Sequence, residues 1–397
     1  MTTTTELYWD PYDTEIDSNP HPVWRRMRDE APVWWNDRYG FFAYTRYADV
    51  EMAHKDPGTY SSAHSTVLEL LGPNKIDSEM MIFMDPPEHT VLRSLVSRAF
   101  TPRRVSALED HIRQLCVEML EPQVGSSGFD YVQDFGAQLP SKVIAALIGV
   151  PADEREAARV LVDTVFHIEP GVGMINDISI NAGIALFEYL QGLIEKRLVD
   201  PQDDMLTALA LAEIEEDGVT RRLTTSEATH FAALLFNAGT ETVARLLGNA
   251  AVILSDNPAE RADMAAHPEI IPSAVEELLR YEAPSPVQGR WTLNDVRLHD
   301  VDVPAGSKVL LLTGSAGRDE RVFPDADRFD PRRKIDHHVS FGYGIHFCVG
   351  AALARMEGRI ALEETLKRFP EWGVDHARAK RLHTSTVRGW SEVPITL

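Results

Sequence analysis

A cysteine in a glycine-rich segment is the first feature of this sequence that could do chemistry. Cys348 lies in the run Phe341–Gly350, directly before the helical pattern of residues 351–369. Glycines at positions 342, 344 and 350 allow sharp turns and a close approach of the backbone to a flat partner. The dipole and the free N–H groups of a helix N-terminus favour a thiolate at this place. The segment could therefore hold a metal-bound thiolate, and a buried free cysteine in a loop is the alternative.

A long helix with a polar interruption is the second feature. Thr224 and Glu227 form a capping box, and the helical periodicity that follows lasts until Asp256. About 32 residues at roughly 1.5 Å each make a rod of roughly 48 Å, long enough to cross a whole domain. The sequence therefore predicts one central helix that can reach the cysteine segment.

The middle of this helix contains Gly239, Glu241 and Thr242 in an otherwise apolar pattern. Glycine costs roughly 1 kcal/mol relative to alanine in a helix, and a threonine hydroxyl can divert backbone hydrogen bonds. Such departures from local preference often mark functional sites. A buried ion pair between Glu241 and Arg245, one turn later, is the alternative reading of the carboxylate.

Two further pairs of charged residues have helical spacing. His89 and Arg93 are four residues apart after the helix start at Asp85, and Glu277 and Arg280 are three apart. Side chains at these spacings share one helix face. A solvated charged face is the ordinary explanation for each pair, and a surface ion pair contributes little stability.

The pattern Phe-x-x-Gly-x-His-x-Cys-x-Gly at residues 341–350 resembles the haem-binding loop of the cytochrome P450 monooxygenases at every defining position. The other elements follow in that family's order over about residues 20–387. The resemblance implies a mainly α fold with a small β-rich lobe, in which the long central helix lies over a haem. It also implies one non-covalent haem b, with the thiolate of Cys348 as its iron ligand.

The resemblance assigns roles to individual residues. Glu241 corresponds to the family's acid, where aspartate is more frequent, and Thr242 to the alcohol that passes protons to bound dioxygen. The remaining cofactor contacts that it implies are His89, Arg93, Arg290 and His346 at the haem propionates, Phe341, Gly342 and Gly350 around the sulfur, and Ala238 and Gly239 on the central helix.

The pair Glu277 and Arg280 resembles the family's Glu-x-x-Arg element, whose glutamate also binds a later arginine. Arg333 is the expected partner, and Arg328 is the second choice. These residues would support the fold around the haem and take no part in the reaction. The family's usual Asn-Arg-Asp is Gly317-Arg318-Asp319 in this chain, which leaves one local turn contact in doubt.

Two stretches are expected to admit substrate. Residues 60–87 form a long segment with many apolar side chains, and residues 166–183 contain a glycine- and proline-rich break between helices. An apolar pocket without a charged anchor would suit a lipid, a terpenoid or a sterol-like compound. Its expected lining is Val67, Leu71, Met81, Phe83, Phe166, Ile168, Met174, Leu234, Thr240, Val287 and Val387.

Other segments have clear secondary-structure patterns. Aromatic runs at residues 33–35 and 41–44 predict a hairpin, and residues 47–55 predict a helix. Strands are expected at residues 287–291 and 307–312, and helices at 184–198 and 273–281. Residues 1–19 are expected to form an extended arm of a single domain that spans 1–397.

Composition limits the class of protein. The 397 residues contain 39 basic and 61 acidic side chains, a formal net charge of −22 that opposes binding to nucleic acid or to anionic membranes. The sequence shows no signal peptide and no run of 18 apolar residues. The two cysteines fit a reducing compartment. We therefore expect a cytoplasmic monomer without a membrane anchor.

The function that the resemblance implies is insertion of one oxygen atom from O2 into a C–H bond or a double bond of a hydrophobic small molecule. Ferredoxin and ferredoxin reductase would bring the electrons from NAD(P)H, and Arg93, Arg98, Arg103 and Arg104 are expected at the docking face for an acidic ferredoxin. The alternatives are a hydrogen peroxide-dependent haem-thiolate peroxygenase, a non-catalytic haem protein that binds ligands, and a haem-free helical interaction protein.

Overall fold

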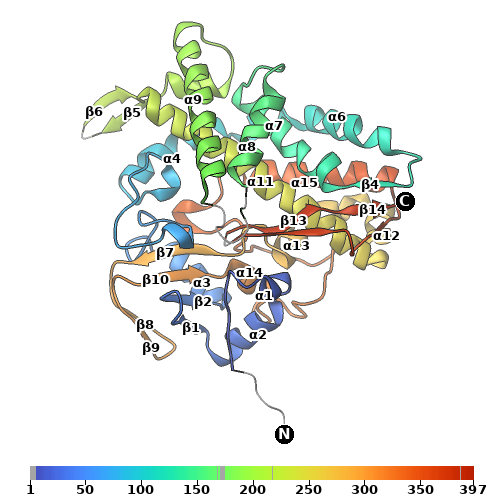
Figure 1. The fold of residues 1–397 in the computed structure, drawn as a ribbon, viewed down its shortest axis with the longest axis horizontal. Helices are drawn as coiled ribbons and strands as arrows, with labels where there is room; N and C mark the ends of the chain where they lie inside the picture. Colours follow the sequence, from blue (N-terminus) through green and yellow to red (C-terminus); the bar gives the residue numbers. More distant parts are fainter. Residues whose placement is uncertain (1–5, 168, 170–174, 217, 385) are drawn as a thin grey trace.

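The structure, a computed structural model, describes residues 6–167, 169, 175–216, 218–384 and 386–397. Helices make up the larger part, and a five-stranded sheet lies at one side together with the N-terminal helices (Figure 1). In the part of the chain that is described, no helix combines the length and the apolar character needed to cross a membrane. The mainly α fold with a small β-rich lobe is confirmed.

The five-stranded sheet is built from segments far apart in the sequence. Its order is β1-β2-β10-β7-β3; β10 and β2 are parallel, and the other neighbours are antiparallel. The predicted hairpin and both predicted strands are confirmed. The bounds are β1 Val33–Asn36, β2 Phe41–Tyr44, β3 Tyr60–Ser61, β7 Gln288–Thr292 and β10 Lys308–Leu311.

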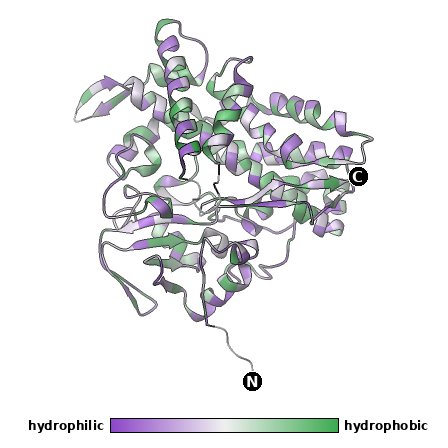
Figure 2. Ribbon diagram, in the orientation of Figure 1, coloured by the Kyte–Doolittle hydropathy of each residue, from purple (hydrophilic) through white to green (hydrophobic). Residues whose placement is uncertain are grey.

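Fifteen α-helices are assigned among the described residues. Figure 2 shows apolar and polar residues interspersed along them. Their bounds are α1 Thr14–Ser18, α2 His21–Glu30, α3 Tyr47–Lys55, α4 Glu88–Ala99, α5 Pro102–Ser106, α6 Glu109–Leu120, α7 Gln138–Ile148, α8 Arg155–Val165, α9 Asp177–Val199, α10 Met205–Ala210, α11 Thr225–Asp256, α12 Pro258–Ala266, α13 Ile271–Tyr281, α14 Thr313–Ala316 and α15 Ala351–Arg368.

Helix α11 is the central element. Its 32 residues follow the predicted capping box, in which the Thr224 side chain accepts from the Glu227 N–H and the Glu227 side chain accepts from the Thr224 N–H. It packs against α7, α8, α9, α10, α12, α13 and α15. Its buried face contributes to both large apolar clusters of the helical part. The predicted long helix therefore organises the core, as expected.

Several elements differ from the expectation or were not predicted. Residues 14–18 of the arm expected to be extended form α1. Helix α9 begins seven residues before the predicted start, at Asp177, so the break after α8 is shorter than expected. The strands that were not predicted are short: besides β3, they are β4 Gly128–Asp130, β5 Glu213–Glu216, β6 Val219–Arg222, β8 Val296–Leu298, β9 Val301–Val303, β11 Gly373–Val374, β12 Lys380–His383, β13 Arg388–Glu392 and β14 Pro394–Thr396.

Candidate functional site: a cysteine loop facing a cationic cluster

The cysteine loop is held closed by its own backbone. Gly342 and Gly344 have φ angles of 68° and 67°, a left-handed conformation that favours glycine. The N–H of Cys348 donates to the carbonyl of Phe341 at 2.9 Å. A side chain at position 344 would collide with the carbonyl oxygen of His54 on α3. The glycines therefore let the loop turn and lie directly against α3.

The environment of Cys348 corrects one expectation. Burial raises the pKa of its thiol, and the N–H groups of Gly350 and Ala351 with the cations Arg93 and Arg355 offset only part of that rise. Helix-terminal N–H groups were expected to favour the thiolate, but in the protein alone desolvation outweighs them. A metal ion bound to the sulfur would remove the proton outright, so the site suits a ligated thiolate better than a free one.

A cluster of buried cationic and imidazole groups lies next to the cysteine loop. The rings of His89 and His346 are 4.2 Å apart, and an Arg290 Nη lies 3.4 Å from Nδ1 of His54. Both ring nitrogens of His89 and the Nε2 atoms of His346 and His54 are buried without a hydrogen-bond partner. Within the described residues, no ion pair joins any of these four side chains to a carboxylate.

The electrostatics of this cluster show too little negative charge. Asp85 is near enough to raise the pKa values of His89 and Arg290 slightly, but its carboxylate accepts from Ser61 and Ser62 and forms no ion pair with either. Burial, together with the neighbouring arginines, lowers the pKa of His89 to about 4, of His54 to about 3 and of His346 to about 2. Burial also lowers the pKa of Arg290 to about 10. Buried donors are normally paired. A group with carboxylates placed here would satisfy them, which fits the two propionates of a haem.

The same geometry limits how a metal could be held. Among the residues that the structure describes, no three His, Cys, Asp or Glu side chains converge as a metal site. Iron at Cys348 would therefore have to arrive inside a group that supplies its other ligands, as a porphyrin does. The residues present thus fit a haem, with the sulfur on one side and the propionates at the cluster.

His54 is a member of this cluster that the sequence analysis missed. It lies near the end of α3, in a helix that was predicted correctly, and it is buried. No local spacing distinguishes it from an ordinary core histidine. Only the contact between α3 and the strand β7 that carries Arg290 brings it to the site.

Arg93 contacts the cysteine loop itself. Its guanidinium donates to the carbonyl of Phe347 at 2.6 Å, and its charge helps to lower the pKa values of His89 and His346. Phe341 lies under the guanidinium of Arg355, which is 4.6 Å from the ring centre. Arg93, which the resemblance assigned to a propionate, thus contacts the cysteine loop, and the contact of these residues with a haem stays a prediction.

The centre of α11 shows an opening in the helical core. Ala238 is exposed, although it lies in the middle of the longest helix, and Thr242, one turn later, is half-buried. The Thr242 hydroxyl donates to the carbonyl of Ala238 at 3.1 Å. Gly239 faces α7 instead, where a side chain would meet Ile144. Thr240 is buried and its hydroxyl donates to Phe236.

Glu241 makes the ion pair that was the alternative to its catalytic role. Two guanidinium nitrogens of Arg245 donate to one Glu241 oxygen at 2.5 and 2.9 Å, and both side chains are buried. Arg245 also donates to the carbonyl of Trp390 on β13. Both bonds go to Oε1 of Glu241, and Oε2 makes no hydrogen bond with any described residue. The role of Glu241 in proton transfer stays a prediction.

The Glu-x-x-Arg element is buried and complete. Arg280 donates to Glu277 through two nitrogens at 2.6 and 2.8 Å, and neither side chain is exposed. Of the two arginines considered, Arg333 makes the second ion pair with Glu277, at 3.1 Å. Arg328 contributes only its carbonyl oxygen. The pair is therefore part of the core between α13 and the segment before the cysteine loop.

The expected substrate residues fall into separate apolar groups. Leu71 and Val287 belong to a cluster beside the five-stranded sheet. Met81 belongs to the apolar cluster that α7–α11 share, and Phe166 and Leu234 pack against it. Val67 and Phe83 are half-buried and Val387 is buried, whereas Ile168 and Met174 lie outside the described residues. A single pocket formed by these residues stays a prediction.

Comparisons with known proteins agree with this geometry. The sequence model of the family described as Cytochrome P450 matches residues 17–388. Vitamin D(3) 25-hydroxylase of Pseudonocardia autotrophica is 36% identical over 417 residues, covering 100% of this chain and 98% of the relative.

Two solved structures are also similar. Cytochrome P450 CYP109Q5 from Chondromyces apiculatus has a TM-score of 0.88 at 34% identity, covering 98% of this chain and 97% of that chain. CYP109E1 from Bacillus megaterium in complex with testosterone has a TM-score of 0.84 at 31% identity, covering 95% and 99%. With its cysteine loop and its anion-deficient cluster, the chain therefore belongs to the cytochrome P450 family, the monooxygenases that carry haem b on a cysteine thiolate.

Proposed function

We propose that this protein hydroxylates or epoxidises a lipid, terpenoid or sterol-like molecule, with Cys348 as the iron ligand. The observation that carries the assignment of the site is the buried cluster of His54, His89, His346 and Arg290 beside the cysteine loop. It has unpaired donors and the charge of Arg290, and no described carboxylate forms an ion pair with it, which supports the binding of haem propionates there.

When bound, the haem supplies the activation of O2 with two electrons. The contribution of Cys348 is a thiolate donor, whose strength is tuned by the N–H groups of Gly350 and Ala351. Thr242 presents a hydroxyl beside the exposed Ala238 and can hold a proton at its oxygen. Glu241 can pass a proton to that hydroxyl through its second carboxylate oxygen, while Arg245 fixes the first.

The proposed substrate class rests on the chain's apolar residues and on its relatives. Residues 60–87 and the α8–α9 region supply apolar side chains, and none of the expected lining residues is charged. One relative is named for the 25-hydroxylation of vitamin D3, and one similar structure holds testosterone. A rigid, mostly apolar molecule of steroid size is therefore the best first candidate.

The proposed electron donors are a ferredoxin and its reductase. Arg103 and Arg104 are exposed on α5, after the helix that carries Arg93, while the side chain of Arg98 lies outside the described part. Local positive charge is needed because the chain as a whole carries −22 and would repel an acidic partner.

The iron-ligand assignment is tested optically. We expect the reduced, carbon monoxide-treated protein to show the red-shifted Soret band of thiolate ligation, and Cys348→Ala to lose it. Retention of that band in Cys348→Ala would contradict the assignment. A titration with testosterone, followed by the Soret shift, tests the substrate class, and the absence of any shift with steroids would exclude it.

The electron source is tested by comparing turnover on hydrogen peroxide with turnover on ferredoxin, reductase and NAD(P)H. We expect coupled product only with the reduced partners, because Glu241 and Thr242 are retained. Faster turnover on peroxide alone would favour a peroxygenase.

A further inference from the structure

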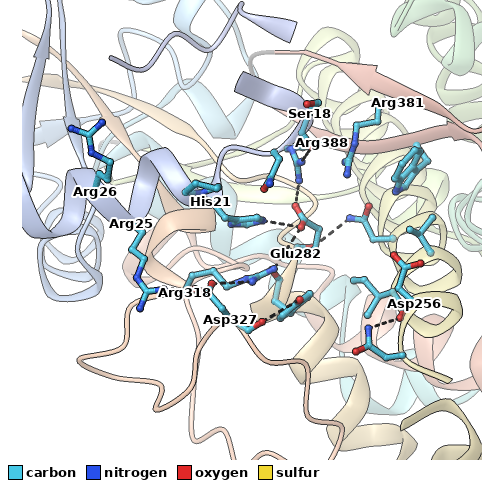
Figure 3. A pocket seen from close by; sticks show the side chains of 18 residues that line it. Ser18, His21, Arg25, Arg26, Asp256, Glu282, Arg318, Asp327, Arg381 and Arg388 are labelled. Atoms are coloured by element: carbon cyan, nitrogen blue, oxygen red, sulfur yellow. Dashed lines mark hydrogen bonds and ion pairs between the residues drawn. The ribbon is translucent and has the colours of Figure 1, made fainter. Parts of the chain in front are cut away.

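A cavity of about 810 Å³ is lined by no residue of the cysteine loop or of the cluster beside it. It is bounded by α2, the C-terminal part of α11 and the hairpin β12–β13 (Figure 3). Asn249 lines it and follows Ala238 by eleven residues, so it lies on nearly the same face of α11 about 16 Å further along. Its volume is in the range of small-molecule sites. Because of this distance along α11 from Ala238, we treat the cavity as separate from the haem site.

The walls combine cationic and apolar side chains. The cationic groups, with one exception, have acidic partners: Arg388 and His21 pair with Glu282, Arg318 with Asp327, Arg25 with Glu320 and Asp327, and Arg26 with Glu30. Burial alone would raise the pKa of Glu282, but Arg388 and His21 lower it well below its usual value. These pairs are thus internally neutralised and need no ligand.

Arg381 on β12 is the exception. Its guanidinium stacks on the ring of Trp390, 4.1 Å from the ring centre, and makes no ion pair or hydrogen bond with any described residue. Its Nη1 is buried and has no partner. In Figure 3 it points into the cavity beside Arg388, and no dashed line reaches it. Burial and the charge of Arg388 lower its pKa to about 10, and the more distant carboxylates of Glu282 and Asp17 offset only part of that fall.

Arg381 is half-buried, and its buried Nη1 has no hydrogen-bond partner among the described residues, which costs free energy because the lost hydration of that donor is not replaced. The planar fork of arginine matches a carboxylate in two parallel hydrogen bonds. Glu282 and Asp256 line the same cavity and would repel a doubly charged phosphate more strongly than a single carboxylate. Val252 and Ile253 supply apolar wall on the side of α11.

We propose that this cavity binds an organic monocarboxylate with an apolar body, whose carboxylate pairs with the guanidinium of Arg381. The apolar body lies against Val252, Ile253 and the ring of Trp390. The site is separate from the substrate site and does not depend on the reaction at the haem.

The test uses the haem-loaded protein with decanoate as the probe, measured by isothermal titration calorimetry and, in parallel, by the Soret spectrum. We expect one equivalent of decanoate that binds without a Soret change. Arg381→Gln should weaken that binding at least tenfold. The matched control Arg378→Gln, an exposed arginine outside the cavity, should leave it unchanged. Decanol and inorganic phosphate should bind at least tenfold more weakly than decanoate.

The proposal would be overturned if Arg381→Gln bound decanoate as tightly as the wild type does. It would also be overturned if decanoate binding always shifted the Soret band, since the ligand would then lie at the haem. Phosphate that binds as tightly as decanoate would overturn the monocarboxylate. If Arg381→Gln does not fold, Arg381→Lys serves instead, since it keeps the charge and loses the fork. It should bind decanoate with intermediate affinity, and wild-type affinity in this variant would equally refute the paired geometry.

Discussion

Arg290 should weaken the haem-free protein and stabilise the haem-bound one. Its guanidinium is buried, without a carboxylate partner among the described residues, and its pKa is lowered to about 10. At about 1.4 kcal/mol for each tenfold change in the equilibrium, holding its charge costs on the order of 3 kcal/mol. Arg290→Met removes this cost and keeps most of the aliphatic volume. We therefore expect the haem-free variant to unfold about 4 °C higher than the wild type.

The haem-bound protein should respond in the opposite direction. Losing a charge-assisted hydrogen bond of about 1.5–3 kcal/mol to a propionate should speed haem loss about tenfold to a hundredfold. Haem loss is measured by transfer to excess apomyoglobin, and unfolding by circular dichroism on protein produced in haem-deficient cells. The control Arg297→Met, an exposed arginine paired with Asp302, should change neither quantity. A less stable haem-free Arg290→Met, or unaltered haem loss, would refute the reasoning.

Four further outcomes are expected. His54 and His89, with pKa values lowered by burial to about 3 and 4, stay neutral in the fold. The haem-free protein should therefore lose about 2 kcal/mol of stability for each as pH falls from about 6.5 to 4.5, as urea titrations at several pH values will show. Glu241→Gln should lower the rate of coupled product formation about 10²-fold or more, whereas an unchanged rate would exclude its proton transfer. Glu277→Gln should destabilise by about 3–5 kcal/mol, because the buried Arg280 and the half-buried Arg333 lose their counter-charge. The matched change Glu276→Gln, at a half-buried neighbour, should cost about 1 kcal/mol, and similar thermal shifts in the two variants would contradict this. Charge reversal at Arg103 and Arg104 should slow reduction by ferredoxin in low salt, and equal stopped-flow rates would rule out this docking face.

Local patterns predicted the elements of the fold better than the contacts of the site. The capping box at Thr224 and the periodicity after it predicted α11 correctly, because its cap and its apolar positions depend on residues close together in the sequence. The edge strands and the C-terminal hairpins were missed, since their runs are short and their stability comes from partners far away in the chain.

Long-range contacts also decided the chemistry of single residues. The ion pair between Glu241 and Arg245 was foreseen as an alternative, because the two are one turn apart. The bond from Arg245 to the Trp390 carbonyl, and the position of His54 beside Arg290, depend on tertiary packing that no spacing reveals. Burial likewise raises the pKa of the Cys348 thiol by more than the N–H groups at the helix terminus lower it.

The contact of the cysteine loop with α3 sets the order in which the chain can finish its site. Gly344 rests on the carbonyl of His54, and nearly three-quarters of the chain separates the two residues. During synthesis the N-terminal segment leaves the ribosome long before the loop exists, and contacts between such distant residues form slowly. Until the last segment docks, the surface of α3 that receives it is open to solvent. We therefore expect haem capture to wait until the loop at residues 341–350 has been synthesised and has docked on α3.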